Sequence, residues 1–291
     1  MNRRASTAVG FVAVLLWSML AILTVGTGAI PPFQLTAMAF SISGTLGILW
    51  VAYSGRLDEL TRVPLHIFGF GTCGLFGYHF LYFSALRTAP PEQASLIAYL
   101  WPLLIVLFSG LLPGERLTRG HAAGALISFT GAALVVSGDG TGFGTAFLPG
   151  YLLAFGGAIV WSSYSLLSRR LGATTTDSVA VFCVLTAILS ALAHVFLEQT
   201  VWPGTVIAWL SILALGVGPV GFAFFAWDVG VKKGDIQVLG TLSYAAPVLS
   251  TMLLILAGIT SPSWQLLTAA ALIATGAGLA TRASANLKTK R

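Results

Sequence analysis

Long segments without any charged residue dominate this chain and limit what it can fold into. Residues 5–55 and 236–281 contain no Asp, Glu, Lys or Arg, and shorter uncharged segments fill most of the rest. Charged residues make up only 8% of the chain and apolar residues 56%, which leaves too little polar surface to cover a soluble core. The pattern excludes a soluble globular enzyme, a disordered protein and a nucleic-acid-binding module, and it favours a protein embedded in a lipid bilayer.

The uncharged segments have the length of membrane-spanning helices. A helix needs about 20 residues to cross the hydrocarbon core, and it satisfies its own backbone hydrogen bonds there. The segments are too long and too uniformly apolar for barrel strands. Two helices fit in each of residues 5–55 and 236–281, and one fits in each of 63–86, 93–114, 120–138, 140–168, 178–197 and 199–227. We therefore predict an all-α membrane protein with ten transmembrane helices.

The basic residues fall on one side of the membrane once these helices are drawn. Arg87 lies in a loop on the outer side. The inner loops and termini contain Arg3, Arg4, Arg56, Arg62, Arg116, Arg119, Arg169, Arg170, Lys232, Lys233, Arg282, Lys288, Lys290 and Arg291. Cytoplasmic segments of membrane proteins are enriched in Lys and Arg, so we expect both termini in the cytoplasm. The net charge of +6 thus reflects topology and indicates no nucleic-acid partner.

The two halves of the chain resemble each other. Tyr99-Leu100-Trp101-Pro102 in the fourth predicted helix corresponds to Tyr244-Ala245-Ala246-Pro247 in the ninth. Thr130-Gly131-Ala132 in the fifth corresponds to Thr275-Gly276-Ala277 in the tenth. We therefore predict two repeats of five helices each.

The second repeat is expected to be inverted in the membrane relative to the first, because five is an odd number. Arg87 falls outside, whereas its counterparts Lys232 and Lys233 fall inside. The predicted repeats are residues 1–145 and 146–291. Inverted repeats are typical of transporters, in which two halves move about a site at their interface. Duplication that serves packing alone is the alternative.

Several motifs resemble a known family. A Trp-Ser pair occurs early in each half, at Trp17-Ser18 and Trp161-Ser162, and a proline lies midway along the fourth and ninth helices. Gly114-Glu115-Arg116-Leu117-Thr118 precedes a helix of small residues. With the two five-helix repeats, these features resemble the drug/metabolite transporter superfamily, EamA type, over the whole chain. The resemblance implies a multi-pass transporter of the bacterial inner (cytoplasmic) membrane that exports small metabolites.

Pro102 and Pro247 are expected to interrupt their helices and to act as hinges. Proline lacks an N–H group, so the carbonyls of Ala98 and Ser243 lose their helical partners. Interrupted helices at matching positions of two repeats point to a binding site, although a purely structural kink is the alternative. The candidate substrate-binding residues in these helices are Tyr99, Trp101, Ser243 and Tyr244.

Aromatic and polar residues share one face on each of two further helices. Such a face should point into the bundle, because lipid cannot satisfy polar groups. The candidates are Tyr78, His79 and Tyr82 in the third helix, Trp161, Tyr164 and Ser165 in the sixth, and Trp17 and Trp227 as repeat counterparts of Trp161 and Tyr82. Alternatively, His79 bonds a neighbouring helix, the Ser165 hydroxyl bonds its own helix, and some of the aromatic residues anchor the membrane interface.

Aromatic amino acids are the expected substrates, because tyrosine and tryptophan stack on aromatic rings. Aromatic cationic drugs are an alternative through cation–π contacts. Import or exchange of another metabolite stays open, and so, less favoured, does an intramembrane enzyme, although no Gly-x-Ser-x-Gly nucleophile motif occurs. We expect no enzymatic activity, no cofactor and no metal site. No nucleotide-binding motif is present, and transport is either coupled to protons through His79 or passive.

The fifth and tenth helices are rich in glycine and alanine, which permits close helix packing. We expect this packing within one chain, and therefore a monomer in the lipid bilayer that binds a small-molecule substrate. A dimer formed through the same faces is the alternative.

Overall fold

The computed structural model describes residues 1–136, 144–171 and 174–289, and this part of the chain contains helices and no strand. The predicted span boundaries at residues 138 and 140, and the basic residues Lys290 and Arg291, lie outside the described residues. Up to residue 136 the α-helices are α1 (Arg3–Trp17), α2 (Leu20–Gly26), α3 (Pro32–Tyr53), α4 (Leu57–Thr61), α5 (Leu65–Thr88), α6 (Pro91–Ala98), α7 (Trp101–Phe108) and α8 (Arg119–Val136). From residue 144 they are α9 (Leu148–Arg170), α10 (Ser178–Leu197), α11 (Val206–Val217), α12 (Ala223–Lys233), α13 (Ile236–Leu242), α14 (Ala245–Leu256) and α15 (Trp264–Thr289).

Within the described residues, nine helical segments are long and apolar enough to cross a membrane. The predicted segment 63–86 is also helical, as the 24-residue helix α5, but it is not among those nine. Its composition explains the difference, because α5 carries the polar residues His66, Tyr78, His79 and Tyr82. The chain is therefore a helical, multi-pass membrane protein.

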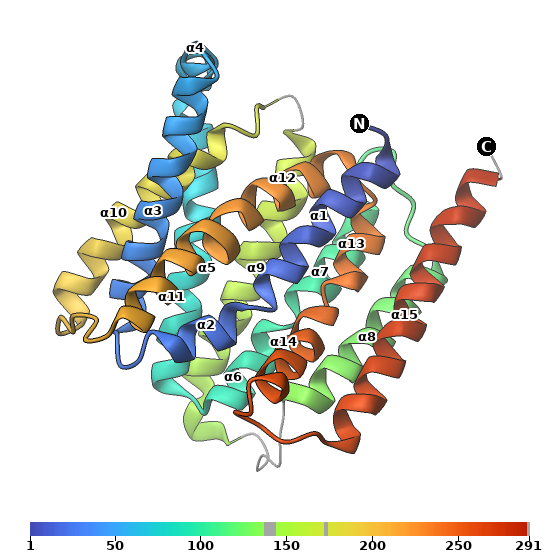
Figure 1. Cartoon of the computed structure of the whole chain (residues 1–291). Coiled ribbons are helices and arrows are strands. Elements are labelled where there is room, and N and C mark those ends of the chain that lie inside the picture. Colours follow the sequence, from blue (N-terminus) through green and yellow to red (C-terminus); the bar gives the residue numbers. More distant parts are fainter. Residues whose placement is uncertain (137–143, 172–173, 290–291) are drawn as a thin grey trace.

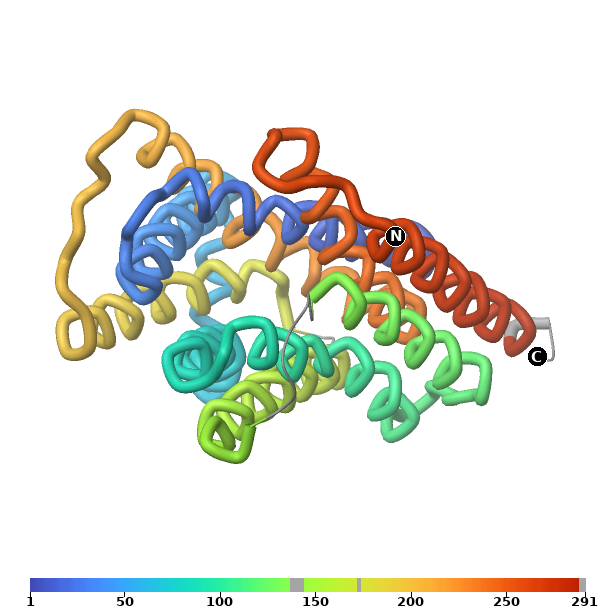
Figure 2. The backbone as a smooth tube through the Cα atoms, turned by 90° about the horizontal axis from the view of Figure 1, so that it is seen from below, coloured from blue at the N-terminus to red at the C-terminus, as the bar shows by residue number. Residues whose placement is uncertain are grey.

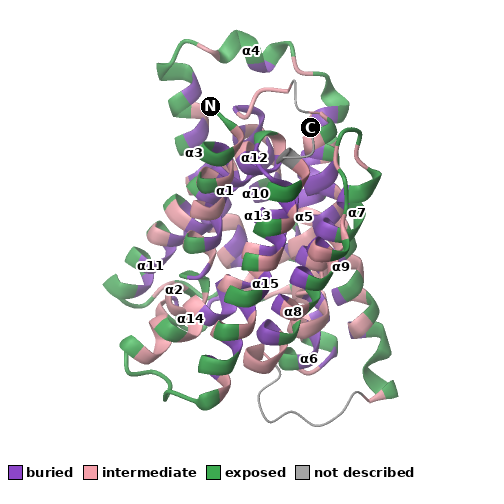
Figure 3. Cartoon of the chain, turned by 90° about the vertical axis from the view of Figure 1, so that its right-hand side faces the viewer, coloured by how far each residue is buried: buried purple, intermediate pink, exposed green. Residues whose placement is uncertain are grey.

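Large apolar side chains on the outside of the bundle agree with lipid surroundings. Leu192, Leu213 and Leu267 are at least half exposed. Figure 3 shows the buried residues inside the bundle and the exposed residues on its periphery. A soluble protein would rarely leave so many large apolar side chains uncovered.

Helices from the two halves of the chain pack against each other. The most extensive contacts are α8 with α15, α3 with α10, α5 with α9, and α1 with α12, and Figure 2 shows α8 beside α15. Small residues allow this approach: a Cβ atom added to Gly276 of α15 would lie 2.3 Å from the Gly124 carbonyl oxygen of α8. The small faces predicted in the fifth and tenth helices are thus used within one chain.

Several of the long helical segments are broken near their middle. The α6–α7 segment breaks at Tyr99 and Leu100, directly before Pro102, and the α13–α14 segment breaks at Ser243 and Tyr244, before Pro247. Each proline lies in the first turn of the second half-helix, where a missing N–H group does no harm. The helix interruptions predicted at the two prolines are confirmed, but the Ser243 carbonyl oxygen, expected to lose its partner, accepts from the Ala246 backbone N–H at 3.1 Å.

Two further interruptions were not predicted. Helix α1 ends at Trp17 and α2 resumes at Leu20, while a π-helical turn over Gly218–Phe222 separates α11 from α12. Helix α1 begins and α15 ends on the same side of the bundle (Figure 1), and all four breaks fall in the interior of their membrane-spanning segments. The broken segments therefore leave room for a cavity between the two halves.

Candidate functional site

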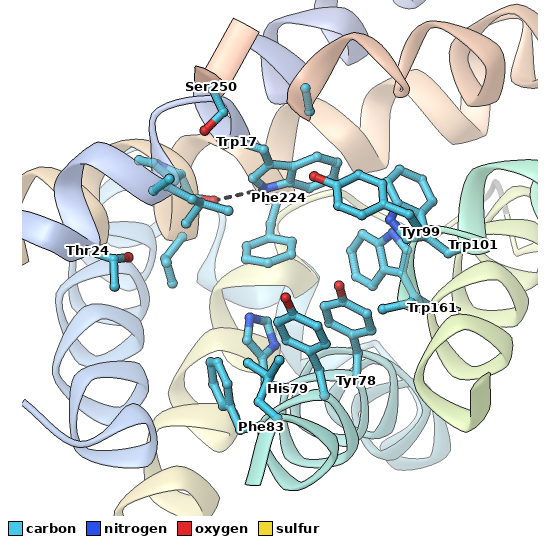
Figure 4. A pocket seen from close by; sticks show the side chains of 18 residues that line it. Trp17, Thr24, Tyr78, His79, Phe83, Tyr99, Trp101, Trp161, Phe224 and Ser250 are labelled. Carbon is cyan, nitrogen blue, oxygen red and sulfur yellow. Dashed lines mark hydrogen bonds between the residues drawn. The ribbon is translucent and has the colours of Figure 1, made fainter. Parts of the chain in front are cut away.

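A cavity of about 480 Å³ lies where the broken helices meet. This volume lies in the range of small-molecule sites. The wall is formed by residues of α1, α2, α5, α6, α7, α9, α12 and α14 and of the π-helical turn. The lining residues are Trp17, Leu20, Ala21, Thr24, Tyr78, His79, Tyr82, Phe83, Leu86, Ala98, Tyr99, Trp101, Trp161, Pro219, Val220, Phe224, Ala246 and Ser250 (Figure 4).

Three tryptophan side chains line one side of the cavity, and a fourth, Trp227, packs behind them. The Trp17 ring centre lies 6.1 Å from that of Trp101, 5.8 Å from Trp161 and 5.0 Å from Trp227. Trp227 is 1% exposed and lies behind the other three, because it does not line the cavity. These edge-to-face and tilted contacts are favourable for aromatic pairs. The four residues belong to α1, α7, α9 and α12, so the aromatic cluster joins both halves of the chain.

Two of the four indole N–H groups of this cluster, those of Trp17 and Trp227, donate hydrogen bonds. Trp17 Nε1 donates to the Pro219 carbonyl oxygen at 3.1 Å, and Trp227 Nε1 donates to Ser165 Oγ at 3.0 Å. Ser165 Oγ in turn donates to the Trp161 carbonyl oxygen at 2.9 Å. The hydrogen bonds fix the ring orientations and leave aromatic faces and edges toward the cavity.

Helix α5 supplies the opposite wall. Tyr78 and Tyr82 are stacked with their ring centres 5.9 Å apart, and the Tyr82 hydroxyl bonds Ser95 Oγ at 3.0 Å. His79 Nδ1 lies 2.7 Å from the Leu75 carbonyl oxygen. Since a carbonyl only accepts, Nδ1 carries the proton, and Nε2 of the neutral ring is a hydrogen-bond acceptor. Figure 4 shows the His79 ring beside Tyr78 and Phe83 at the cavity.

Seven of the predicted substrate-binding residues line the cavity: Trp17, Tyr78, His79, Tyr82, Tyr99, Trp101 and Trp161. The structure places Tyr164, Ser165, Trp227, Ser243 and Tyr244 behind this lining. The predicted hinges Pro102 and Pro247 also lie outside the lining, next to the breaks.

The residues behind the lining support it through specific contacts. The Tyr164 ring packs 5.2 Å from Trp161 and stacks 5.5 Å from Phe70. Ser243 Oγ donates to the Leu239 carbonyl oxygen of its own helix at 2.9 Å. The Tyr244 hydroxyl accepts from the Leu103 backbone N–H at 2.9 Å, just after the break in the other half. Tyr244 therefore satisfies the backbone of a broken helix.

Several lining residues were missed from the sequence. Phe224 contacts Trp17 at 6.0 Å and His79 at 6.3 Å between ring centres, and Thr24 and Ser250 bring hydroxyl groups to the wall. Phe224 follows the unpredicted π-helical turn, and Thr24 follows the unpredicted break after α1. Their positions depend on these local distortions. Gly218-Pro219, inside the uncharged segment 199–227, is a sequence signal for the second distortion that was overlooked.

The cavity can hold an aromatic solute by stacking and by hydrogen bonds to neutral groups. Its lining contains no Asp, Glu, Lys or Arg. Within the described part of the chain, no group of three or more His, Cys, Asp or Glu residues could hold a metal ion. The site thus offers aromatic rings, hydroxyl groups and one imidazole as binding groups.

Known proteins are similar to this chain in sequence, and a solved structure is similar to it in fold. A protein of Ancylobacter novellus named aromatic amino acid exporter YddG is 53% identical over 284 residues, covering 97% of this chain and 98% of that protein. Proteins of the same name from Salmonella typhimurium and Escherichia coli are 30% and 28% identical, covering 87% and 91% of this chain and 88% and 94% of theirs. A solved crystal structure with 52% identity has a TM-score of 0.92, and the match covers 96% of this chain and 98% of that one.

The family profile matches the chain in two segments, residues 6–137 and 148–282. Both segments contribute to the wall of the cavity, and the relatives align with the chain over most of its length. The membrane-spanning helices, the cavity between them and these matches lead to one conclusion: the chain belongs to the EamA-like transporter family.

Proposed function

We propose that this protein exports aromatic amino acids across the bacterial inner membrane by exposing one central cavity alternately to each side. The observation that carries the proposal is the 480 Å³ cavity with an aromatic lining and no charged side chain. An aromatic amino acid is neutral overall, and its ring stacks on tryptophan and tyrosine. The three relatives named as aromatic amino acid exporters support the same substrate class.

The proposed architecture has ten transmembrane helices, which are the nine apolar segments and α5. They form two inverted repeats of residues 1–145 and 146–291. The helix contacts support the repeats. If each helix is replaced by its counterpart in the other repeat, the α1–α12 contact becomes the α9–α5 contact. The α3–α10 and α8–α15 contacts stay the same, because each joins two counterparts. Both termini are cytoplasmic, since α12, whose last turn contains Lys232 and Lys233, ends on their side of the bundle, whereas α5, whose last turn contains Arg87, ends on the other side (Figure 1). The α8–α15 packing within one chain supports a monomer.

The predicted residues fall into two groups in this proposal. Substrate is contacted by the seven lining residues, with the three tryptophans and three tyrosines holding the aromatic ring. The supporting group is Tyr164, Ser165, Trp227, Ser243 and Tyr244, which fix the lining residues and the broken backbones through the contacts described above. Pro102 and Pro247 are the hinge positions, because each lies beside a break in a long helix.

His79 is proposed to receive the amino group of the substrate. With Nδ1–H committed to the Leu75 carbonyl, Nε2 is an acceptor, and an acceptor binds an ammonium group rather than a carboxylate. The Phe224 and Phe83 rings, which also line the cavity, lie 6.3 and 5.9 Å from the His79 ring. Aromatic faces near an ammonium group add cation–π attraction. His79 therefore orients the substrate by its charged end while the tryptophans hold its ring.

Counterflow of labelled phenylalanine in proteoliposomes tests the substrate. We expect exchange by the unaltered protein and roughly tenfold slower exchange for Trp161→Ala, equivalent to about 1.4 kcal/mol of lost ring contact. Trp264→Ala is the matched control, because Trp264 is 68% exposed and lies away from the cavity. Equal exchange by the two variants, or no exchange by the unaltered protein, would contradict the proposal.

Competition with 3-phenylpropionate, which lacks the amino group, tests the role of His79. The unaltered protein should prefer phenylalanine, and His79→Phe should lose this preference because it keeps a ring but removes the acceptor. A preserved preference would show that another group binds the ammonium.

Repeating the counterflow assay with an imposed pH gradient separates proton-coupled from passive transport.

A further inference from the structure

A cluster of charged side chains closes the bundle at the end where both termini lie. Its members are Arg3 of α1, Glu115 before α8, Arg169 at the end of α9 and Asp235 before α13. Along α9, Arg169 lies eight residues, or about 12 Å, beyond the cavity residue Trp161. Along α1, Arg3 lies fourteen residues, or about 21 Å, before Trp17. The aromatic cluster of Trp17, Trp101, Trp161 and Trp227 therefore lies between the cavity and these charges.

Each half of the chain contributes one acid and one base to the cluster. Arg3 Nη2 lies 3.1 Å from Glu115 Oε2 and 3.3 Å from Asp235 Oδ2. Arg169 Nη2 forms the second ion pair of Glu115. The pairs Arg3–Asp235 and Arg169–Glu115 both connect the first half to the second. The cluster is thus a reciprocal crosslink between the halves, with equal numbers of positive and negative groups.

Backbone and amide contacts complete the cluster. Arg169 Nη1 donates to the carbonyl oxygens of Val231 at 2.7 Å and Gly234 at 2.9 Å, which fastens the end of α9 to the α12–α13 connection. With its amide nitrogen turned toward the acids, Gln237 donates to Asp235 and Glu115 at 3.3 Å. The Glu115 and Asp235 side chains are only 8% and 9% exposed. Charge-assisted bonds shielded from water in this way are stronger than surface ion pairs.

We infer that this cluster is the inner gate of the transporter, and that Glu115 is the residue on which its closure depends. Four segments that must separate for the cavity to open toward the cytoplasm all meet at the cluster, and Glu115 pairs with an arginine from each half. The Gly114-Glu115-Arg116 motif would thus hold the inner side closed while the cavity is open to the outer side. The inference rests on the alternating access proposed above, and it is independent of which solute is carried.

Thiol labelling from the cytoplasmic side tests the gate. Ala246, which lines the cavity, is replaced by cysteine in a chain that also carries Cys73→Ser and Cys183→Ser, and inside-out vesicles are treated with a membrane-impermeant maleimide. Glu115→Gln keeps the side-chain shape and removes the charge. We expect it to speed labelling roughly tenfold, a factor equivalent to about 1.4 kcal/mol. Glu59→Gln on the exposed helix α4 is the matched control and should leave the rate unchanged.

Unchanged labelling of Glu115→Gln relative to Glu59→Gln would overturn the inference. If Glu115→Gln does not fold, Asp235→Asn replaces it, because asparagine still caps α13 but loses the ion pair with Arg3. Phenylalanine counterflow by the unaltered protein is measured alongside. Counterflow without faster labelling would refute the gate and leave the proposed function intact, whereas faster labelling without counterflow would support the gate and refute the substrate.

Discussion

The contact between α8 and α15 gives a sharp prediction about stability, because two glycines on α15 differ only in what they face. A Cβ atom added to Gly276 would lie 2.3 Å from the Gly124 carbonyl oxygen and 3.0 Å from the Ser128 backbone nitrogen. A Cβ atom added to Gly278 meets nothing within 4 Å. We therefore predict that Gly276→Ala destabilises the protein and that Gly278→Ala does not.

The distances set the magnitude of the effect. Non-bonded heavy atoms approach favourably at about 3.5 Å, so α8 and α15 must move apart by roughly 1 Å to admit the Gly276→Ala methyl group. Backbone atoms block the space, so a side-chain rotation cannot relieve the overlap. A gap of that size forfeits about a quarter to a half of the dispersion energy at the contact, and overpacking of this kind costs about 1–3 kcal/mol. Gly278→Ala should instead gain up to about 1 kcal/mol from helix propensity.

Thermal unfolding in detergent, followed by tryptophan fluorescence, measures the difference between the two variants. Gly276→Ala should unfold several degrees below the unaltered protein, and Gly278→Ala at the same temperature or slightly above it. If Gly276→Ala is as stable as Gly278→Ala, the close approach of α8 and α15 is not what stabilises the pair, and the reasoning from helix packing fails.

Three further substitutions test buried polar contacts, each read by the same thermal assay. Glu198→Gln should cost about 1–3 kcal/mol, because the buried carboxylate accepts two backbone N–H groups at the start of α3, each at 3.0 Å. Asp228→Asn should cost about 3 kcal/mol, since it leaves the 6% exposed Lys232 ammonium without the carboxylate 2.9 Å away. Tyr244→Phe should cost about 1 kcal/mol, because the Leu103 N–H loses its acceptor. Unchanged unfolding temperatures would mean that these contacts contribute nothing to stability.

The spacing of charged residues predicted where most helices lie, because the bilayer penalises charge and fixes helix length. Charge spacing also predicted the helix at 63–86, whereas mean hydropathy does not mark it as a membrane span. Helix α5 carries Tyr78, His79 and Tyr82 of the cavity wall, and these polar side chains lower the apolarity that marks a membrane span. A cavity-lining helix is therefore harder to recognise from hydropathy than a helix that faces lipid.

Helical periodicity predicted correctly which residues share one face of a helix, but it did not predict how far along the helix the cavity extends. Trp161, Tyr164 and Ser165 share one face of α9, as predicted, but only Trp161 reaches the cavity. The other two lie about one turn nearer the end of α9 that carries Arg169, behind the tryptophan cluster, where Ser165 bonds the Trp227 indole. The angle around a helix follows from sequence spacing, whereas the depth at which a cavity ends depends on how other helices pack. The same limit explains why Trp227 was expected at the site.

The broken helices show what a proline motif can and cannot specify. Pro102 and Pro247 mark breaks in corresponding segments of the two halves, and the cavity does lie beside them. However, a backbone group beside one break is satisfied from the other half, through the Tyr244 hydroxyl and the Leu103 N–H. Backbone polar groups buried in a membrane need a partner at all times, including when the cavity is empty. The Tyr244 hydroxyl provides such a partner within the protein, so the backbone beside the break is not free to bind substrate. The paired breaks therefore predict where a binding site lies, whereas the side chains around the cavity recognise the substrate.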